Sequence, residues 1–485
     1  MPRLPPDTDT GSPHELVVPQ EWTSIAVARV GDLRLPPAVC LEGSLDVAAA
    51  CRELVRRDVD YALVRDGGRL GMIAARELGR CLLLDIPASR IATRTAASFD
   101  LPVLHPQTPV WEALRLLDAH RGRPLLVRGD DGARGLLGAD GLVAMMASLW
   151  QAAGAQPGQA CSLDALAADA GRVDAMVAQL HRQGIRVERV AMLVGNLNAS
   201  LFQRAWSLLA PPEVRRRGCL LVMGSEGRGE QIVKTDQDNA LLLPDGAALE
   251  GLQQAAADFN AALRRFGYPA CPGDIMVTNP LWRQSLQGFK ENLRRWLRGA
   301  EPTGVMNLAI FMDARAVCGD PELLVQARRF LHDCLVDNDA FYARFAHPAV
   351  QFRDDAGWRR WLGRGGEASS VDLKKQGTFP IVHGVRALAL QARIESLGTV
   401  ERLRALAGLG VVSDSLARDL ADALQVLMAM KMEVNLRQRE EGLPLHNVVG
   451  LAGLPTLERG RLADCLAVIR PFRRLLRRHF SLDSL

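Results

Sequence analysis

The chain has 485 residues, of which 48% are hydrophobic and 24% are charged, and its formal net charge is +4. This length is too great for one compact core, so it predicts two to four domains. The composition is that of an ordinary globular protein. Proteins that bind nucleic acid or a membrane surface normally carry concentrated basic patches. So small a net charge gives no argument for either as the main partner, and we expect neither.

The N-terminal segment and the cysteines indicate where the protein works. Residues 1–20 contain no apolar run that would make a signal peptide, and no uncharged stretch of about 18 residues occurs that would cross a bilayer. The nine cysteines are scattered and none has C-x-x-C spacing, which argues against a zinc ribbon or a thioredoxin-type site. This usage suggests a reducing cytosol, so we expect a cytoplasmic protein.

Residues 1–25 are rich in Pro, Asp, Thr and Gly and are expected to form a disordered leader. A repeat follows over residues 26–150. Each copy has an entry segment, a helical pattern, two apolar strands joined by a turn, and the start of a second helix. In the first copy these segments are Pro37–Leu41, Leu45–Val55, Tyr61–Val64, Leu70–Ala74 and a helical start at Glu77; in the second they are Val103–Pro106, Pro109–Ala119, Pro124–Val127, Gly135–Gly138 and the residues after Asp140. Two β-α-β-β-α units of about 60 residues predict a repeat architecture.

This order resembles a tandem pair of cystathionine-β-synthase (CBS) domains, a family whose members pack face to face and often bind adenine nucleotides. The family prefers Gly-x-x-Thr-x-x-Asp at its nucleotide-contacting turn, whereas the two copies here run from Gly71 to Glu77 and from Gly135 to Gly141. The hydroxyl is missing from both, and the ribose-holding carboxylate survives only as Glu77. Two interpretations stay open: an adenine-nucleotide sensor that uses Glu77, or a pair kept for dimerisation or as a scaffold. We expect a homodimer.

Residues 151–160 are small and polar and predict a linker. From Ser162 to about Pro211 the apolar spacing is helical throughout, as at Leu193, Leu197 and Leu201. The Pro-Pro pair that begins at Pro211 should end this helical section.

The stretch from Cys219 to Leu243 carries residues suited to chemistry. Its first five residues, CLLVM, form a short apolar run typical of a buried strand. Gly224 and Ser225 follow at once, and three glycines within six residues allow close backbone approach. A strand that turns through Gly-Ser into a helix presents free backbone N–H groups to an anion. The motif is not a Walker A loop, because no Gly-Lys-Ser/Thr follows, and it is not a Rossmann fingerprint.

Two acids, Asp236 and Asp238, run into the apolar segment Asn239–Leu243, and together they predict a second strand. Residues two apart on a strand face the same side, so both carboxylates should project toward the Gly-Ser turn. Carboxylates held this close repel each other unless a cation lies between them. Mg²⁺ suits such a pair together with substrate phosphates, and two ions would clamp the attacking and leaving oxygens of a phosphoryl displacement. We therefore expect Mg²⁺, or Mn²⁺, as the cofactor.

A third acid should come from a neighbouring strand, and the segment from Ala309 to Val317 is the best candidate. Its alternation places Asp313 and Arg315 on one face. An Asp in the middle of a strand is costly unless it is paired or bound to metal. Asp313 is therefore either a third metal ligand or the ion-pair partner of Arg315. Asp274, in a Pro-Gly loop, is a rival third acid.

The full string resembles the nucleotidyltransferase-like domain that is fused to CBS pairs in bacterial signalling proteins. That domain is itself similar to the glutamine-synthetase adenylyltransferases and the PII uridylyltransferases. The family core, Gly-Ser-Glu-Gly-Arg-Gly-Glu-Gln followed by Thr-Asp-Gln-Asp-Asn-Ala, is unchanged at Gly224–Gln231 and Thr235–Ala240. The resemblance continues at Gly267–Pro269, Cys271–Gly273, Met276–Trp282 and Phe311–Arg315.

This resemblance implies a metal-dependent nucleotidyl transfer from a nucleoside triphosphate (NTP). Gly224 and Ser225 would hold the triphosphate. Asp236 and Asp238 would bind the metals, and Asp313 would be the third ligand or the base.

Four further residues acquire expected roles from the same resemblance. Arg228 and Lys234 would neutralise phosphate charge, unless they are ordinary exposed side chains. Asn279 and Trp282 would line a base or acceptor pocket, although a Trp in Asn-Pro-Leu-Trp is more often a core residue.

The C-terminal part of the chain is helical by pattern and predicts a bundle. The block from Asp372 to His383 resembles the helical substrate-binding domain that follows the transferase in the same family. On that resemblance Lys374 and Lys375 would face the active-site cleft; as a solvated pair they need no explanation. His383 and His446 have no partner at metal-ligand spacing and are expected to be structural.

The expected fold class is therefore multidomain, α/β plus all-α. It comprises a tandem CBS pair over residues 26–150, a polymerase-beta-like nucleotidyltransferase α/β domain with N-terminal helices over residues 161–320, and a helical substrate-binding bundle over residues 321–485.

The expected function is transfer of a nucleoside monophosphate from an NTP to an acceptor, with a protein as a candidate acceptor, under regulation by the CBS pair. The alternative is a catalytically degenerate module that senses nucleotide and signals through protein contacts. In that case the acids would hold metal and NTP without turnover. A third interpretation, a purely structural Gly-Ser loop, does not account for two coplanar acids beside three glycines.

Overall fold

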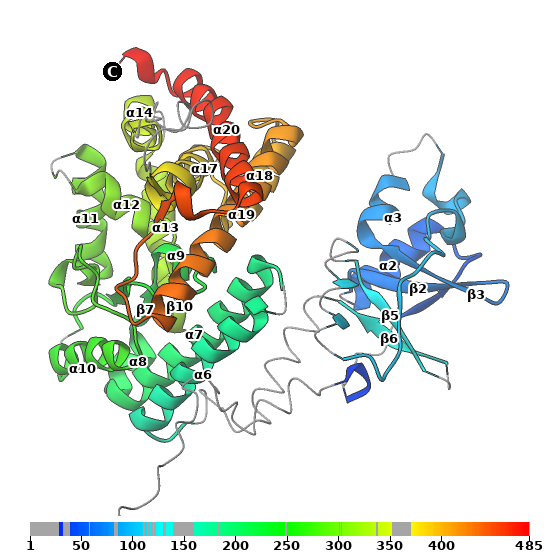
Figure 1. The fold of residues 1–485 in the computed structure, drawn as a ribbon, viewed down its shortest axis with the longest axis horizontal. Helices are drawn as coiled ribbons and strands as arrows, with labels where there is room; N and C mark the ends of the chain where they lie inside the picture. The colour runs from blue at the N-terminus through cyan, green and yellow to red at the C-terminus, as the bar shows by residue number, and fades with distance from the viewer. Residues whose placement is uncertain are drawn as a thin grey trace, which may run out of the picture. The chain divides into compact units, whose positions relative to one another are not determined.

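The computed structural model of the protein divides into two compact units, Met1–Ala155 and Gln156–Leu485. The residues that it describes are 29–32, 39–57, 59–81, 86–109, 112–113, 116–117, 120, 123–129, 132–138, 160–182, 185–247, 250–299, 301, 303–335, 338–351 and 370–484. The expected leader, the linker up to residue 159 and the expected helix after Asp140 lie outside them. Figure 1 shows the elements of each unit.

The first unit contains the same strand arrangement twice. Its elements are β1 (Cys40–Glu42), α2 (Val47–Arg57), β2 (Tyr61–Asp66), β3 (Arg69–Ala74), α3 (Ala75–Cys81), β4 (Val103–Leu104), β5 (Leu125–Gly129) and β6 (Gly132–Leu137). In each copy the first strand pairs parallel with the second, and the second pairs antiparallel with the third. A parallel pair needs a crossover between its strands, which α2 supplies in the first copy. The predicted repeat is confirmed.

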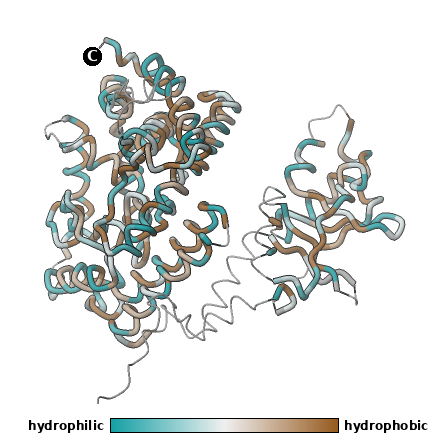
Figure 2. Tube along the Cα trace, in the orientation of Figure 1, coloured by the Kyte–Doolittle hydropathy of each residue, from teal (hydrophilic) through white to brown (hydrophobic). Residues whose placement is uncertain are grey.

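Apolar residues hold the first copy together. Val47 and Leu54 of α2 pack in one cluster with Val64 of β2 and Ile73 of β3. Figure 2 shows the strands of this unit as its most apolar segments. The predicted turn between β2 and β3 is also present, where Gly67 and Gly68 have φ values of 54° and 82°. Two successive positive φ values are the requirement of a tight hairpin turn, and glycine meets it without steric cost.

A four-stranded sheet in the order β10-β7-β8-β9 forms the centre of the second unit. Its strands are β7 (Cys219–Val222), β8 (Asn239–Leu243), β9 (Arg283–Ser285) and β10 (Arg315–Gly319). β7 pairs antiparallel with β8 and β10, whereas β8 pairs parallel with β9. Leu220 and Val222 face one hydrophobic cluster, while Cys219 and Leu221 face another. β7 is therefore buried on both sides, as its continuous apolar run predicts.

Helices cover both faces of this sheet. Trp206 and Phe259 pack on the Leu220 side, and Phe289 and Phe311 pack on the Leu221 side. The helices before and around the sheet are α6 (Leu163–Arg182), α7 (Val187–Leu209), α8 (Pro212–Arg217), α9 (Gly224–Gly227), α10 (Leu252–Arg265), the short η4 (Pro280–Trp282), α11 (Leu286–Arg298) and α12 (Gly304–Phe311). The helical pattern expected from Ser162 to Pro211 is confirmed as α6 and α7.

The rest of the second unit is almost entirely helical, as expected. It contains α13 (Glu322–Cys334), α14 (Asp339–Ala346), α15 (Pro348–Gln351), the π-helical turn η5 (Leu373–Thr378), α17 (Phe379–Gln391), α18 (Thr399–Gly408), α19 (Asp414–Glu440) and α20 (Thr456–His479). A small two-stranded sheet joins β11 (Ser370–Asp372) to β12 (Val448–Gly450). The buried residues of these helices belong to the same cluster as the Leu221 face of the sheet, so the α/β and all-α parts share one core.

The segment expected as a strand from Ala309 to Val317 is wrong in its first half. α12 continues to Phe311, a turn holds Asp313, and β10 begins only at Arg315. An apolar run of this length is compatible with a buried helix as well as with a buried strand. Packing against Phe289 and Trp296 of α11 decides in favour of the helix here.

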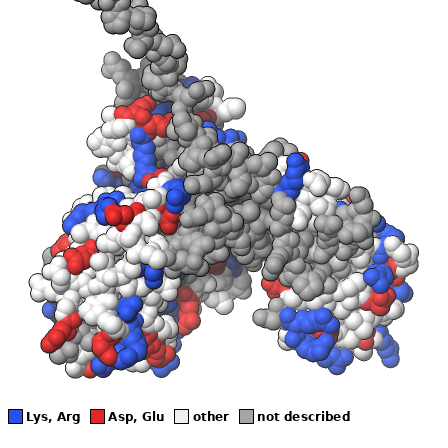
Figure 3. Space-filling view, turned by 90° about the horizontal axis from the view of Figure 1, so that it is seen from below, with Lys and Arg blue, Asp and Glu red and all other residues white. Residues whose placement is uncertain are grey.

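No helix in the described parts of the chain is long and apolar enough to cross a membrane. Acidic and basic side chains are interspersed on the face of the second unit that Figure 3 shows.

Candidate functional site

The turn that follows β7 is shaped around the side chain of Asp238. Gly224 has a φ of 58°, a left-handed value that other residues rarely adopt. A Cβ atom on Gly224 would overlap the Oδ2 atom of Asp238. Glycine is thus required twice at this position, once by its backbone angle and once by the approach of the carboxylate. The predicted closeness of the Gly-Ser turn and the second acid is present in the structure.

Asp236 and Asp238 lie just before β8, on the side opposite a buried amide network. Gln237 and Asn239 alternate with them and both hydrogen-bond to Asn260 of α10. The backbone oxygen of Asp238 accepts from Met223 N at 2.9 Å, which extends the β7–β8 pairing to this residue. Extended backbone alternates its side chains, so the amides are fixed in the core and the two carboxylates face away from it.

The charge of Asp236 acts on the neighbouring carboxylate of Asp238. Burial raises the pKa of Asp238 to about 6, and the charge of Asp236 adds to that rise. A hydrogen bond from the Cys271 thiol and the charges of Lys374 and Arg228 act in the opposite direction. Burial, together with the charge of Asp238, raises the pKa of the Cys271 thiol to about 11. An acidic pair of this kind favours a cation between its members.

Arg228 joins the glycine turn to the helical part of the unit. Its Nε donates to Glu230 at 2.6 Å and its Nη1 donates to Asp313 Oδ2 at 2.6 Å. Glu230 in turn accepts from Thr399 N at 2.8 Å, at the first residue of α18. A Cβ on Gly227 would overlap the backbone oxygen of Asp313. The turn therefore fits closely against the residue that follows α12.

Asp313 is fully buried among three guanidinium groups, those of Arg228, Arg386 and Arg402. Oδ1 accepts from Arg386 Nε at 3.1 Å and from Arg402 Nη1 at 3.0 Å. Oδ2 accepts from Arg228 and from Arg386 Nη2. Burial alone would raise the pKa of Asp313, but the three arginines outweigh it and hold the pKa well below its usual range.

These contacts correct two expectations about Asp313. A carboxylate offers about four lone-pair positions, and four donated hydrogen bonds occupy all of them, so Asp313 is not a third metal ligand in this arrangement. Its ion-pair partner is not Arg315 either, because Arg315 lies 3.6 Å from Glu226 and donates to backbone oxygens of Gly195 and Glu226. The rival acid, Asp274, is exposed in its loop. Among the described residues, no group of three acidic, His or Cys side chains is placed to hold a metal ion.

Lys234 is also placed differently from the expectation. Its side chain is 4% exposed and its Nζ donates to Asp174 at 2.8 Å and to the backbone oxygen of Ala170. It also lies over the ring of Tyr268. The Lys234 ammonium group therefore fastens the site segment to α6 and is not directed at a phosphate. An exposed side chain, the other expectation, is equally wrong.

Asn279 and Trp282 do not line the cavity described below. The Asn279 side chain accepts from Leu281 N and donates to the backbone oxygen of Asp274, so it caps η4. Trp282 is 1% exposed and packs against Phe289 and Trp296. The core alternative is the correct one for Trp282, because its indole is buried among these aromatic rings. His383 is also structural, with hydrogen bonds to Phe345 O and Arg386.

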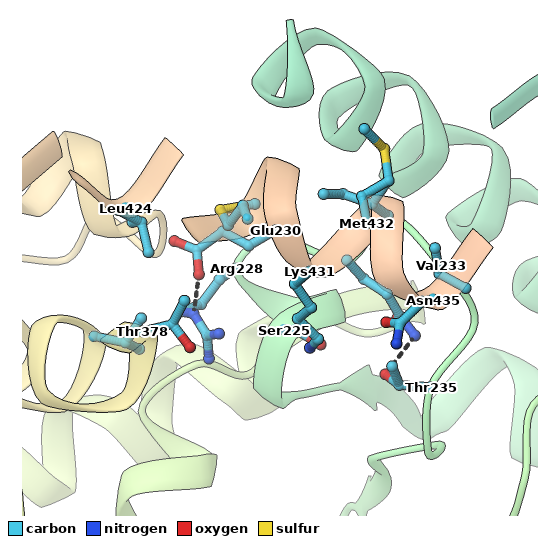
Figure 4. Close-up of a pocket in the computed structure, with 14 residues that line it drawn as sticks. Ser225, Arg228, Glu230, Val233, Thr235, Thr378, Leu424, Lys431, Met432 and Asn435 are labelled. Atoms are coloured by element: carbon cyan, nitrogen blue, oxygen red, sulfur yellow. Dashed lines mark hydrogen bonds and ion pairs between the residues drawn. The ribbon is translucent and has the colours of Figure 1, made fainter. Parts of the chain in front are cut away.

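Beside these contacts, a cavity lies between the glycine turn and the helical part of the unit (Figure 4). One wall consists of Ser225, Arg228 and the segment from Glu230 to Val233, with Thr235. The other wall comes from α19 and from the junction of η5 and α17; it comprises Thr378, Val382, Leu424, Met428, Lys431, Met432 and Asn435. Ser225 is thus the expected site residue that opens on this cavity together with Arg228.

Lysines are concentrated around the site. The chain has 59 Lys and Arg residues, and 5 of them are lysines. Lys374 and Lys375 are exposed on η5, where the Asp372 side chain accepts from both backbone N–H groups. Lys374 lies close enough to Asp238 to influence its pKa, whereas Lys375 lies 4.0 Å from Asp372. Lys431 lines the cavity. It is not predicted from the sequence, where the scarcity of lysine marks Lys290 on α11 equally.

Glu226 is a buried acid within the glycine turn. It is 5% exposed, its Oε2 accepts from Asn198 at 3.0 Å, and its Oε1 has no hydrogen-bond partner among the described residues. Burial raises its pKa to about 7, against the opposing effects of Asn198 and Arg315.

This burial predicts a pH-dependent stability. An acid whose pKa is higher in the folded state than in the unfolded state loses stabilisation as the pH rises through that interval, here from 4.5 to about 7. We expect the free energy of unfolding of the wild type to fall by about 2–3 kcal/mol relative to Glu226→Gln across this range. Thermal melts at pH 5 and pH 8 measure the difference. Glu213→Gln, at an exposed position, is the matched control, and parallel pH profiles of wild type and Glu226→Gln would contradict the prediction.

Glu77, the expected nucleotide contact of the first unit, caps its own helix. Its Oε2 accepts from Ala74 N at 2.8 Å, and its Oε1 lies 3.6 Å from Arg76 and 3.8 Å from Arg123. A nucleotide hydroxyl would have to share this carboxylate with two arginines.

Comparison with known families divides the second unit into two parts. Residues 171–303 match the model described as "Putative nucleotidyltransferase DUF294". Residues 339–480 match the model described as "Putative nucleotidyltransferase substrate binding domain". None of the curated proteins matches the chain.

Solved structures resemble the first unit. A "putative acetoin utilization protein" from Vibrio cholerae is 18% identical over 25% of this chain and 93% of that chain, with a TM-score of 0.24. A CBS domain protein from Pyrobaculum aerophilum, complexed with AMP, is 20% identical over 25% of this chain and 98% of that chain, with a TM-score of 0.23. The repeated strand pairing of the first unit, rather than these scores, carries its description as a CBS-like α/β region.

Proposed function

Because the chain belongs to the family of DUF294 nucleotidyltransferases that carry their own substrate-binding domain, we propose that it transfers a nucleoside monophosphate from an NTP to an acceptor. The single observation that carries this proposal is the fit between Gly224 and Asp238, where a glycine that leaves no room for a side chain brings the glycine turn against the Asp238 carboxylate. A turn with a purely structural role has no need of two acids beside it that form no ion pair with the described residues.

The proposed reaction is an in-line displacement at the α-phosphorus of the NTP. A bond forms between the acceptor oxygen and the α-phosphorus, and the bond from that phosphorus to the bridging oxygen of pyrophosphate breaks. The acceptor loses its proton to solvent, so the products are the nucleotidylated acceptor, pyrophosphate and a proton. Ser225 and the backbone of the glycine turn would orient the phosphates, and Arg228 would add positive charge at the edge of the cavity.

The acidic pair fits a divalent cation. Asp236 and Asp238 are neighbours on the side of the extended segment that faces away from the core. The charge of Asp236 contributes to the raised pKa of Asp238. These two carboxylates would hold Mg²⁺ or Mn²⁺, which would withdraw charge from the triphosphate. Asp313 instead fixes three arginines, so we assign it a positioning role.

The experiment that tests this function is label transfer from NTPs. The full-length protein is incubated with each of four α-³²P-labelled NTPs, with Mg²⁺ or Mn²⁺ and with an extract or candidate proteins as acceptor. We expect incorporation with at least one NTP and its loss, by more than about 100-fold, when EDTA removes the metal. Labelled γ-phosphate is the control, because it leaves with pyrophosphate and should not be incorporated. Binding of an NTP without transfer to any acceptor would favour the degenerate sensing module.

We further propose that the acceptor is a protein, that a protein dimer is the functional form, and that the CBS pair regulates transfer by binding an adenine nucleotide. The supporting features are the repeated strand arrangement of the first unit and the substrate-binding region of the second.

A further inference from the structure

We propose that Lys431, on α19, binds the phosphates of the nucleotide, so that the helical region completes the nucleotide site as well as receiving the acceptor. This inference rests on the proposed function. It assigns the nucleotide to the cavity between the glycine turn and α19, with its phosphates at the Ser225 end and its nucleoside against the apolar wall.

The shape and lining of the cavity carry the first step. Lys431 and Ser225 line the same cavity from opposite walls, although they belong to different family-matched regions. Figure 4 shows the Lys431 side chain running from α19 toward the side of the cavity formed by the glycine turn. Lys431 makes no hydrogen bond or ion pair with any of the described residues. Its ammonium group is therefore available to a ligand.

The electrostatic surroundings of Lys431 suit an anion. Burial lowers the pKa of Lys431 to about 8, and the charges of Lys374 and Arg228 lower it further, against the effects of Asp236 and Asp372. The charges of Lys374 and Arg228 thus repel Lys431, although Arg228 is itself paired with Glu230 and Asp313. A triphosphate would offset this repulsion and favour the charged form of Lys431.

The remaining lining of the cavity suits a nucleoside. Leu424, Met428 and Met432 of α19 and Val382 of α17 present apolar surface on the helical side. Asn435 uses its Nδ2 atom for Gln438 and His446, which leaves its carbonyl oxygen as a polar group at the edge of the cavity. Apolar walls with few fixed polar groups are the usual composition of a small-molecule site.

Titration calorimetry on the full-length protein tests the proposal with Mg²⁺ and each of ATP, GTP, CTP and UTP. For the NTP that binds most tightly, Lys431→Met should raise the Kd about 10- to 100-fold, because a charge-assisted contact is lost. Lys431→Arg should stay within a few-fold of the wild type. Lys290→Met, the same substitution on α11 away from the cavity, is the matched control and should bind as the wild type does.

The outcomes separate this inference from the proposed function. If the wild type binds an NTP and Lys431→Met binds it equally well, Lys431 has no phosphate role while nucleotidyl transfer still stands. If the wild type binds none of the four NTPs, both fall. Thermal melting of each variant checks the fold; should Lys431→Met unfold, Lys431→Gln, with a polar end of similar length, provides the same comparison.

Discussion

Asp238→Asn should abolish nucleotidyl transfer and at the same time make the protein more stable. The substitution keeps the shape of the side chain and its acceptor for the Cys271 thiol, but it removes the negative charge that a cation needs. We expect transfer to fall by more than about 1,000-fold, which corresponds to roughly 4 kcal/mol of transition-state stabilisation. The assay is incorporation of α-labelled nucleotide under saturating Mg²⁺.

The gain in stability follows from the raised pKa. Asp238 has a pKa of about 6 in the folded protein against 3.8 for the free side chain, so its ionisation opposes folding as the pH rises through this interval. At neutral pH the neutral amide should add about 1–3 kcal/mol to the free energy of unfolding. Groups that raise activity at the expense of stability are common at functional sites.

The matched control for this variant is Asp274→Asn, in the exposed Pro-Gly loop. Asp274 has a φ of 54°, which Asn tolerates as well as Asp does. It should change neither transfer nor the melting temperature. Full activity of Asp238→Asn would sink the assignment of the acidic pair, whereas loss of activity together with loss of the fold would show that the side chain is structural.

Asp313→Asn should be the most destabilising substitution of a single charged residue in the second unit. It leaves Arg386 and Arg402, which are 6% and 1% exposed, without their carboxylate. Removing one partner of a buried charge cluster costs about 3–5 kcal/mol, because the remaining charges cannot be solvated. Chemical denaturation followed by circular dichroism measures this loss.

A double variant distinguishes uncompensated charge from simple loss of contacts. Combining Arg402→Met with Asp313→Asn removes one of the guanidinium groups that Asp313→Asn leaves unpaired. The double variant should therefore lose less free energy of unfolding than the sum of the losses in the two single variants. Additive losses, or a change below about 1 kcal/mol in Asp313→Asn, would mean that water or relaxation already screens the cluster.

The sequence predicts those elements whose signal is local. CLLVM predicts a strand because a run of five buried positions bounded by Gly is short for a helix, and β7 is indeed buried on both faces. The carboxylate pair is predicted because side chains two positions apart on extended backbone point to the same side, and this needs no information about distant residues. The glycine turn is predicted because glycine readily adopts the left-handed backbone that Gly224 has here.

The elements that are wrong depend on distant residues. The apolar run before Asp313 is compatible with a strand, and only packing against α11 makes it a helix. Of the three arginines that pair with Asp313, Arg228 precedes it by 85 positions, and Arg386 and Arg402 follow it by 73 and 89. No spacing rule connects them. Lys234 is likewise held by α6, which precedes it by some 60 residues. Lys431 belongs to the same class, since its relation to Ser225 exists only once α19 lies across the cavity.

The contacts between the glycine turn and the helices have a consequence for dissecting the protein. The two family models end and begin at residues 303 and 339, yet β10, an edge of the sheet, lies between them. Glu230 holds the first turn of α18, and Asp313 lies against arginines of α17 and α18. Truncating the chain between the two matched regions would therefore divide a single hydrophobic core. The two parts are better regarded as a single folded body, in which exchanging the helical half for another would also require redesigning the glycine turn.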